Sequence, residues 1–170
     1  MEAKYVFNNK GFKIDGLFLL KPKIFHDERG FFMESWNKKE FSRILKKDFN
    51  FKQDNFSYSS NGVLRGLHYQ VNPNAQDKLV SCLEGKIFDV AIDLRKNSKT
   101  FGDWAGLWLD DINHEQFFIP KGFAHGFLVV SEYAKVKYKT TSYYSANSER
   151  AIVWNDSDIN VNWPLEMISP

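Results

Sequence analysis

Hydrophobic and polar residues alternate along much of the chain with the period of two that is typical of β-strands. The clearest case is the segment 86–95 (KIFDVAIDLR), in which one face is apolar and the other carries two carboxylates. The apolar face consists of Phe88, Val90, Ile92 and Leu94, and the other face of Ile87, Asp89, Ala91 and Asp93. We expect the apolar face to meet a core, and the carboxylates to point at solvent or into a polar cavity.

Five further segments have strand character, and turn signals such as Glu84-Gly85 and Pro120-Lys121-Gly122 separate them. These segments are residues 78–83, 100–109, 115–119, 127–130 and 134–141. Many short strands at a spacing of roughly 8–12 residues predict an all-β sandwich or barrel.

One short helix is expected over residues 37–47. Asn37 can cap its N-terminus, and Glu40 stands three residues later, as in a capping box. Phe41, Ile44 and Leu45 then fall on one face. We expect this helix to lie at the surface and to cover one end of a sheet.

The chain has 170 residues and no Gly/Ser linker, low-complexity tract or internal repeat, which predicts one domain over residues 1–170. Aromatic residues are frequent, with 16 Phe, 7 Tyr and 5 Trp; such rings suit strands and can line a pocket that stacks on a ligand ring. The net charge of +2 is too balanced for a protein whose main work is binding the nucleic-acid backbone. An anionic ligand must therefore meet a few placed cations.

The sequence also predicts a cytoplasmic protein with no membrane partner. A single cysteine, Cys82, excludes an internal disulfide and suits a reducing compartment. No apolar run approaches the ~18 residues that a membrane span needs. The first residues, MEAKYVFNNK, lack the apolar centre of a secretory signal.

Two stretches combine glycine with histidine: residues 62–70 (GVLRGLHYQ) and residues 119–127 (IPKGFAHGF). The second contains Pro120-x-Gly122-x-x-His125, which resembles the second half-motif of the cupin barrels. The first half-motif of metal-binding cupins has two histidines one residue apart, and here that position is His68-Tyr69-Gln70. From the second half-motif we expect a cupin-type jelly-roll barrel with a short surface helix. We expect no metal, because a divalent metal needs three or four imidazole, carboxylate or thiolate ligands.

Six segments together resemble the nucleotide-sugar 3,5-epimerases, the family of dTDP-4-dehydrorhamnose 3,5-epimerase. They are FHDERGFFMES (25–35), KQDNFSYSSNGVLRGLHYQ (52–70), QDKLVSCLEGKIFDVAIDLRKNSKTFG (76–102), IPKGFAHGF (119–127), YKTTSYYSANSE (138–149) and WNDSDINVNWP (154–164). The resemblance covers roughly residues 18–164, in the family's order and spacing. It implies an isomerase of rhamnose biosynthesis that inverts carbons 3 and 5 of dTDP-4-keto-6-deoxyglucose to give dTDP-4-keto-L-rhamnose.

The chemistry of this reaction can be compared with the residues. Hydrogens on carbons beside a ketone are acidic because the anion delocalises onto oxygen, so epimerisation needs a base, an acid on the opposite face and a group that stabilises the enolate. The resemblance assigns these roles to His68, Tyr138 and Lys78, respectively. An imidazole of ordinary pKa about 6.5 and a phenol of about 10 suit the base and the acid. The reaction needs no redox cofactor, and none is expected.

The resemblance also implies substrate contacts and a homodimer. The contacts are Arg29, Glu34, Gln53, Asp54, Asn55, Arg65, His125, Tyr144 and Glu149, with Asp89 as the carboxylate that orients His125. Family members exchange N-terminal strands between two subunits, so Arg29 and Glu34 are expected to serve the neighbour's site. Tyr138 and Tyr144 are six residues apart, so an unbroken strand would point both rings into one cavity, unless Ser142 or Ser145 breaks the register.

Other functions stay open. One is an epimerase that inverts a single carbon, or that accepts a related dTDP- or GDP-linked 4-keto sugar. A second is a ketoisomerase on the same scaffold, and a third is a non-catalytic cupin that binds a sugar nucleotide. Arg29 could also form only a surface ion pair with Asp27 or Glu28.

The family pattern differs from this sequence after the WP segment. There the family has a lysine and then an aspartate, and the aspartate pairs with the catalytic histidine. This sequence continues LEMISP. We therefore expect either that the natural chain is longer or that another carboxylate orients His68.

Overall fold

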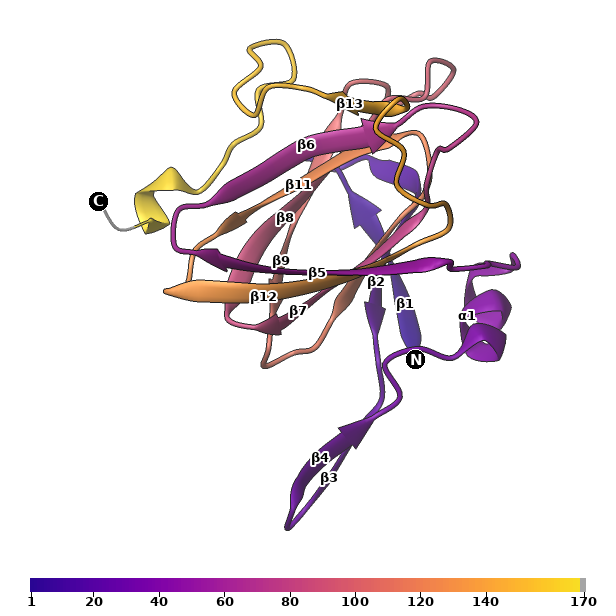
Figure 1. Cartoon of the computed structure of the whole chain (residues 1–170), viewed down its shortest axis with the longest axis vertical. Helices are drawn as coiled ribbons and strands as arrows, with labels where there is room; N and C mark the ends of the chain where they lie inside the picture. Colours follow the sequence, from indigo (N-terminus) through magenta and orange to yellow (C-terminus); the bar gives the residue numbers. More distant parts are fainter. Residues whose placement is uncertain (169–170) are drawn as a thin grey trace.

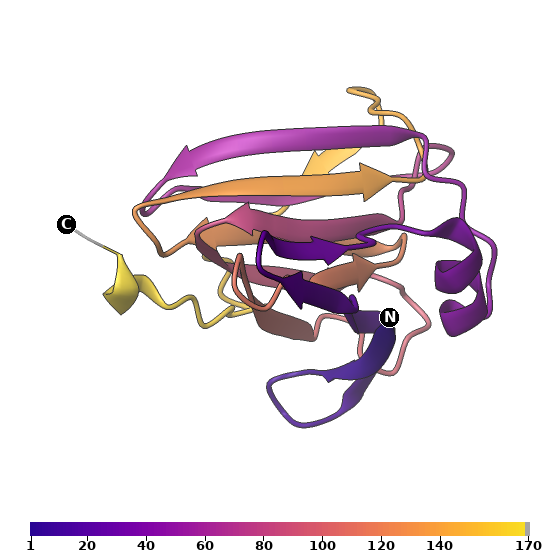
Figure 2. The same ribbon diagram turned by 90° about the horizontal axis from the view of Figure 1, so that it is seen from below.

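The computed structural model describes residues 1–168, and two antiparallel sheets form most of it (Figure 1). The strands are β1 (Glu2–Phe7), β2 (Lys13–Lys21), β3 (Ile24–Asp27), β4 (Gly30–Met33), β5 (Gln53–Ser60), β6 (Leu64–Gln70), β7 (Lys78–Glu84), β8 (Lys86–Asp93), β9 (Trp104–Asp110), β10 (Gln116–Ile119), β11 (Phe123–Val129), β12 (Tyr133–Thr140) and β13 (Glu149–Ala151). One sheet has the order β1-β2-β10-β7-β12-β5 and the other β13-β6-β11-β8-β9. The sheets pack face to face (Figure 2), which confirms the predicted all-β jelly roll.

The main core lies between the two sheets. Val80, Phe117 and Val136 project into it from the six-stranded sheet, and Ile87 and Phe127 from the five-stranded sheet. All five are at most 3% exposed. Burial of each such side chain stabilises the fold by about 1.5–3 kcal/mol, so this core holds the two sheets together.

Strand β8 is buried on both faces, which corrects part of the expectation for residues 86–95. The outer face carries Phe88, Val90 and Ile92 under Trp163 of the C-terminal segment, and the inner face carries Ile87 and Ala91 in the main core. The two carboxylates of the inner face, Asp89 and Asp93, are completely buried. Neither of them points at solvent, because both β8 faces pack against other parts of the chain.

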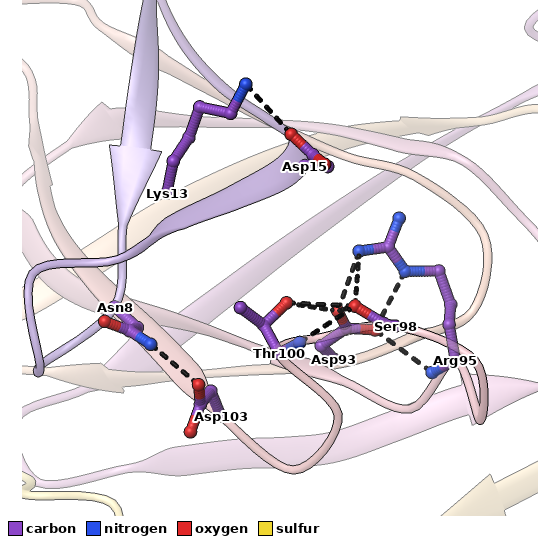
Figure 3. Close-up of polar contacts among 8 residues, drawn as sticks. All are labelled: Asn8, Lys13, Asp15, Asp93, Arg95, Ser98, Thr100 and Asp103. Carbon is purple, nitrogen blue, oxygen red and sulfur yellow. Dashed lines mark hydrogen bonds and ion pairs between the residues drawn. The ribbon is translucent and has the colours of Figure 1, made fainter.

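A polar turn determines where β9 begins. It starts at Trp104 rather than at Thr100, because the preceding residues form a turn around Asp93 (Figure 3). The Asp93 carboxylate accepts hydrogen bonds from Arg95 Nη2 at 2.7 Å, Ser98 Oγ at 2.6 Å and Thr100 Oγ1 at 2.8 Å. These residues therefore cannot extend the strand.

The other strand predictions are confirmed with small shifts, except at one end of β11. That strand begins at Phe123, four residues before the predicted segment, directly after a turn in which Gly122 has a φ of +91°. Seven further strands were not predicted individually: β1 to β6 and β13. Several of these are short or amphipathic only in part.

The predicted helix is present as α1 (Lys38–Leu45), at one end of the layered body (Figure 2). The Asn37 side chain caps it by accepting a hydrogen bond from the Glu40 N–H at 3.2 Å, while the Glu40 carboxylate pairs with Arg43 instead of closing a capping box. Phe41 is completely buried in an aromatic cluster. Within residues 1–168, no helix is both long enough and apolar enough to cross a membrane.

Strands β3 and β4 form a hairpin that extends away from both sheets (Figure 1). Its aromatic residues Phe25, Phe31 and Phe32 are 50%, 51% and 69% exposed. Exposed apolar side chains gathered in this way are typical of a surface that binds another molecule.

Candidate active site

A cavity of about 710 Å³ lies between the two sheets, within the size range of small-molecule sites. Strands β5, β7 and β12 line it from the six-stranded sheet, and β6, β11 and β13 from the five-stranded sheet. It brings together most of the predicted site residues: Gln53, Asn55, Arg65, His68, Lys78, His125, Tyr138, Tyr144 and Glu149.

Two histidines occupy paired positions of neighbouring strands, His68 on β6 and His125 on β11. His125 is buried, and its Nε2 lies 2.9 Å and 3.1 Å from the two carboxylate oxygens of Asp89. This is the contact that the resemblance implies for Asp89. Burial lowers the pKa of His125, and the Asp89 carboxylate acts in the opposite direction. The imidazole of His68 is exposed to the cavity.

The backbone around these histidines depends on glycine. A Cβ on Gly66 would lie 2.6 Å from the Gly126 Cα, and a Cβ on Gly126 would lie 2.6 Å from the Arg65 carbonyl oxygen. Real Cβ atoms do not fit at such distances, so only glycine allows β6 and β11 to approach this closely. The glycines of the two histidine motifs therefore set the distance between the strands that carry His68 and His125.

Lys78 is a buried cation at the start of β7, with its Nζ 3.4 Å from the His68 carbonyl oxygen. Burial lowers the pKa of Lys78 to about 8, although the carboxylates of Asp89 and Glu149 favour the charged form. The amine is therefore still mostly protonated at pH 7. A buried ammonium of this kind can stabilise negative charge that develops on a carbonyl oxygen.

Tyr138 approaches the cavity from β12, in the sheet opposite to the one that carries His68. Its ring centroid lies 6.5 Å from that of His125, with the ring planes at 63°. Burial raises the pKa of Tyr138, so the phenol keeps its proton and can donate it. An imidazole and a phenol thus reach one cavity from opposite walls.

Polar groups suited to a diphosphate lie at the β5 side of the cavity. The Arg65 Nε donates to Ser59 Oγ at 2.8 Å, and its Nη2 lies 3.4 Å from the Tyr58 carbonyl oxygen. Gln53 Nε2 donates to Asn55 Oδ1 at 2.8 Å. The guanidinium remains exposed, and its forked N–H groups match the oxygens of a diphosphate.

Tyr138 and Tyr144 line the same cavity, but not on an unbroken strand. β12 ends at Thr140, two residues before Ser142, and the segment 141–148 turns to place the second ring. The Tyr144 hydroxyl donates to Glu149 Oε2 at 3.0 Å, and this contact raises the pKa of Tyr144. The shared cavity is confirmed, and the strand between the two rings is interrupted, which is the alternative that the sequence left open.

Asp54, which was predicted as a substrate contact, does not line this cavity. Its carboxylate lies 2.8 Å from Lys139 Nζ and 3.2 Å from Lys137 Nζ. Side chains alternate along a strand, so Asp54 points away from the face of β5 that carries Gln53 and Asn55.

Arg29 and Glu34 belong to the hairpin region and do not line the cavity of their own chain. Arg29 forms an ion pair with Asp27 at the hairpin turn, which is the surface pairing considered above. Glu34 directly follows β4 and is exposed.

Eight cavity residues were not predicted from the sequence, and the fold places them beside the predicted ones. They are Phe56, Ser57, Leu64, Gly66, Tyr69, Gln70, Gln76 and Phe127. Strand alternation from Asn55 would have found Ser57, and alternation from His68 would have found Gln70. The Ser57 hydroxyl oxygen is buried without a hydrogen-bond partner in the part of the chain that the structure describes.

No group of three or more His, Cys, Asp or Glu side chains among residues 1–168 is arranged to hold a metal ion. The cavity instead combines an imidazole, a phenol and a buried ammonium. Fold and cavity together define a jelly-roll protein with the groups for proton transfer at a carbon beside a carbonyl.

The model of the dTDP-4-dehydrorhamnose 3,5-epimerase family matches residues 11–170, and the chain belongs to this family. The chain is 52% identical over 154 residues to the dTDP-4-dehydrorhamnose 3,5-epimerase of Shigella flexneri, an alignment that covers 91% of this chain and 85% of that protein.

Two solved structures show the same fold. One is the dTDP-6-deoxy-D-glucose-3,5-epimerase of Legionella pneumophila in complex with dTDP-4-keto-L-rhamnose, with 48% identity and a TM-score of 0.88 over 96% of this chain and 84% of that one. The other is a 3'-monoepimerase of Streptomyces bikiniensis in complex with dTDP-quinovose, with 31% identity and a TM-score of 0.84 over 89% of this chain and 76% of that one.

Proposed function

We propose that this protein is an isomerase that inverts carbons 3 and 5 of dTDP-4-keto-6-deoxyglucose and so forms dTDP-4-keto-L-rhamnose for deoxysugar biosynthesis. The observation that carries the proposal is the approach of His68 and Tyr138 to one cavity from opposite sheets, with buried Lys78 in the same lining. Identity of 52% to a dTDP-4-dehydrorhamnose 3,5-epimerase supports the choice of substrate.

The reaction proceeds by two similar proton exchanges. His68 removes the proton from a carbon beside the 4-keto group, and the electron pair of the broken C–H bond moves onto the keto oxygen as an enolate forms. Lys78 stabilises the negative charge on that oxygen. Tyr138 then donates its proton to the opposite face of the same carbon. The phenolate regains a proton from water, His68 releases its proton to water, and the other flanking carbon follows.

The nucleotide part occupies the polar side of the cavity. Arg65 binds the diphosphate together with Gln53 and Asn55, because all three reach the cavity from β5 and β6, which follow one another along the chain. Tyr144 provides a flat ring for the thymine, and Glu149 accepts a hydrogen bond from the Tyr144 hydroxyl. His125, held by Asp89, contacts the sugar.

A second copy of the chain completes the site. Arg29 and Glu34 lie near a hairpin that extends from the body and exposes three phenylalanines. Strand β5 lies at the edge of its sheet and carries cavity residues, so its free edge can accept strands of a partner. The homodimer therefore exchanges N-terminal strands, and each Arg29 serves the partner's cavity. Residues 1–170 form one domain that works in the cytoplasm, where the buried free thiol of Cys82 stays reduced.

Proton exchange in deuterated water tests the function directly. The protein is incubated with dTDP-4-keto-6-deoxyglucose without added metal or nicotinamide, and deuterium is located by NMR and mass spectrometry. Label at both carbons 3 and 5 is expected for the wild-type chain, and none for His68→Asn. Absence of label with the wild-type chain, while dTDP still binds, would contradict the epimerase and favour a sugar-nucleotide-binding protein.

A second candidate is an epimerase of a single carbon. The observation that favours it is the 3'-monoepimerase of the same fold, with a TM-score of 0.84. For an epimerase of a single carbon, the exchange experiment in deuterated water should place deuterium at carbon 3 alone. Parallel assays with a GDP-linked 4-keto sugar separate the two nucleotide classes.

A further inference from the structure

Tyr144 lies outside the strands, in the segment 141–148 that connects β12 to β13. A ring in such a segment can serve as a platform for a base only where its backbone is held in place. Three glutamine side chains, Gln53, Gln70 and Gln76, bind the backbone of residues 142–145. Hydrogen bonds from these three side chains therefore hold the segment in place beside the cavity.

Gln70 holds both neighbours of Tyr144 along the chain. Its Oε1 accepts a hydrogen bond from the Ser145 N–H at 2.7 Å, and its Nε2 donates to the Tyr143 carbonyl oxygen at 3.1 Å. The same Nε2 donates to the Asn74 carbonyl oxygen at 2.7 Å, which ties the segment to the loop after β6. The side chain is nine-tenths buried, so water does not readily replace these bonds.

The other two glutamines hold the remaining parts of the segment. Gln53 Oε1 accepts a hydrogen bond from the Tyr144 N–H at 3.0 Å. Gln76 Nε2 donates to the Ser142 carbonyl oxygen at 2.8 Å. Each residue from 142 to 145 is thus bound through its backbone by a glutamine.

The hydroxyl end of Tyr144 is held as well, and again beside Gln70. Its O–H donates to Glu149 Oε2 at 3.0 Å, and Glu149 is the residue that pairs with Gln70 in the β13–β6 ladder. Gln70 thus fixes the backbone on both sides of Tyr144 through its side chain, and it lies opposite Glu149, the partner of the hydroxyl, in the strand ladder.

We propose that Gln70 is a positioning residue that holds the Tyr144 ring at the place where it stacks on the base of the nucleotide, and so sets affinity for the nucleoside part of the substrate. This inference rests on the proposed function, because it takes a dTDP-linked sugar as the ligand. Gln70 acts through Tyr144 and not on the diphosphate. Loss of its hydrogen bonds therefore weakens binding of dTDP without changing binding of a diphosphate that has no base.

The test compares dTDP with inorganic pyrophosphate by isothermal titration calorimetry on the chain of residues 1–170. Gln70→Met keeps the approximate size of the side chain and removes its hydrogen bonds. We expect the dissociation constant for dTDP to rise about tenfold, as for loss of one base–aromatic contact, and that for pyrophosphate to stay within about twofold. In turnover, KM rises by a similar factor and kcat changes little.

A double-mutant cycle links the effect to the ring. In the Tyr144→Ala background, Gln70→Met should change the dTDP dissociation constant by less than about twofold, because the ring that Gln70 positions is already absent. Gln76→Met, which removes one hydrogen bond to the same segment, is a milder second variant with an expected rise of about threefold in the dTDP dissociation constant. It tests the same mechanism if Gln70→Met does not fold.

Asn61→Leu is the matched control. Its side-chain amide also donates to backbone carbonyls, those of Val130 at 3.1 Å and Ser131 at 2.9 Å, but it follows the opposite end of β5 from Gln53. This variant should lower Tm and leave the dTDP dissociation constant unchanged.

The outcomes separate the inference from the proposed function. Weaker dTDP binding with unchanged pyrophosphate binding and non-additivity with Tyr144→Ala supports the role of Gln70. Unchanged dTDP binding in a folded Gln70→Met chain, or equal weakening for dTDP and pyrophosphate, overturns the inference while the epimerase stands. Failure of the wild-type chain to bind dTDP at all overturns the proposed function and the inference with it.

Discussion

Strand β8 carries two completely buried carboxylates on one face, four residues apart, and their surroundings differ. Asp93 accepts hydrogen bonds from Arg95, Ser98 and Thr100, all on the turn that follows it (Figure 3). Asp89 has the imidazole of His125 as its side-chain partner, and that imidazole lines the cavity.

The difference shows that two buried carboxylates on the same inner strand face can have different roles. Burial acts to raise the pKa of Asp93, but the hydrogen bonds from Arg95, Ser98 and Thr100 together hold it below its ordinary value. Its interactions are all with the turn, so they contribute to stability. Asp89 instead holds a ring that lines the cavity, so we expect its contribution to be to the site.

Asp93→Ala is expected to have the largest effect, and on stability. The variant leaves Arg95, Ser98 and Thr100 without their shared acceptor in a buried position. We expect the free energy of unfolding to fall by about 3 kcal/mol, with kcat near the wild-type value while the chain is folded. Urea denaturation and turnover measured well below Tm check this. A fall of less than about 1 kcal/mol would contradict the assignment of Asp93 to the turn.

Asp89→Asn is the counterpart, with its effect on activity. An amide of the same size can donate to the ring nitrogen that the carboxylate now accepts from, so His125 can adopt the other tautomer. We expect kcat to fall about tenfold to a hundredfold, with a smaller loss of stability than for Asp93→Ala. Steady-state kinetics and thermal unfolding of both variants give the comparison. An unchanged kcat with a large fall in Tm would make Asp89 a stability residue like Asp93.

The ionisation of Lys78 gives a second comparison between Asp89 and Asp93. Burial lowers the pKa of Lys78 from 10.5 to about 8 in the folded chain, so between these values the unfolded chain holds a proton that the folded chain has lost. Stability from this group therefore rises with pH across that window, by about 2 kcal/mol between pH 8 and pH 10 relative to Lys78→Met.

Turnover should respond to the same titration in the opposite direction, because the enolate needs the ammonium form, and kcat should fall above pH about 8. Since the Asp89 carboxylate favours the charged form of Lys78, Asp89→Asn should move this fall to lower pH, and Asp93→Asn should leave it in place. A stability difference between wild type and Lys78→Met that is constant from pH 8 to pH 10 would rule out the lowered pKa.

Asp54→Asn is expected to have the smallest effect. The carboxylate is half-exposed and pairs with Lys137 and Lys139 on the face of β5 away from the cavity. Surface pairs of this kind contribute little, so we expect a stability change within about 0.5 kcal/mol and a KM within about twofold of wild type. Asn55→Ala, one residue further along, should raise KM more. Equal effects of the two variants on KM would mean that Asp54 also contacts the substrate.

The local features of this protein could be predicted from sequence with some accuracy. Alternation identified β8 and most of its neighbours, and Asn37 and Phe41 identified α1, because period and capping depend on residues close together in the chain. The histidine motifs and the family resemblance predicted His68, Lys78 and Tyr138 as site residues, and all three line one cavity.

Other features were decided only by the tertiary structure. The direction of the Asp54 side chain, toward Lys137 and Lys139, was not predicted because β5 was not predicted as a strand, and side chains alternate along a strand. The hydrogen bonds of Gln70 to Tyr143 and Ser145 join positions more than 70 residues apart, and no local pattern specifies them.

The sequence by itself therefore determined strands β7 to β12, the start of the helix, and the imidazole, phenol and ammonium groups that line the cavity. The tertiary structure decided which of two equivalent-looking carboxylates supports a turn and which supports the site, and how Tyr144 is held. The physical reason is that periodicity is a property of neighbouring residues, whereas the role of a buried polar group is set by the donors and acceptors that folding brings to it from distant parts of the chain.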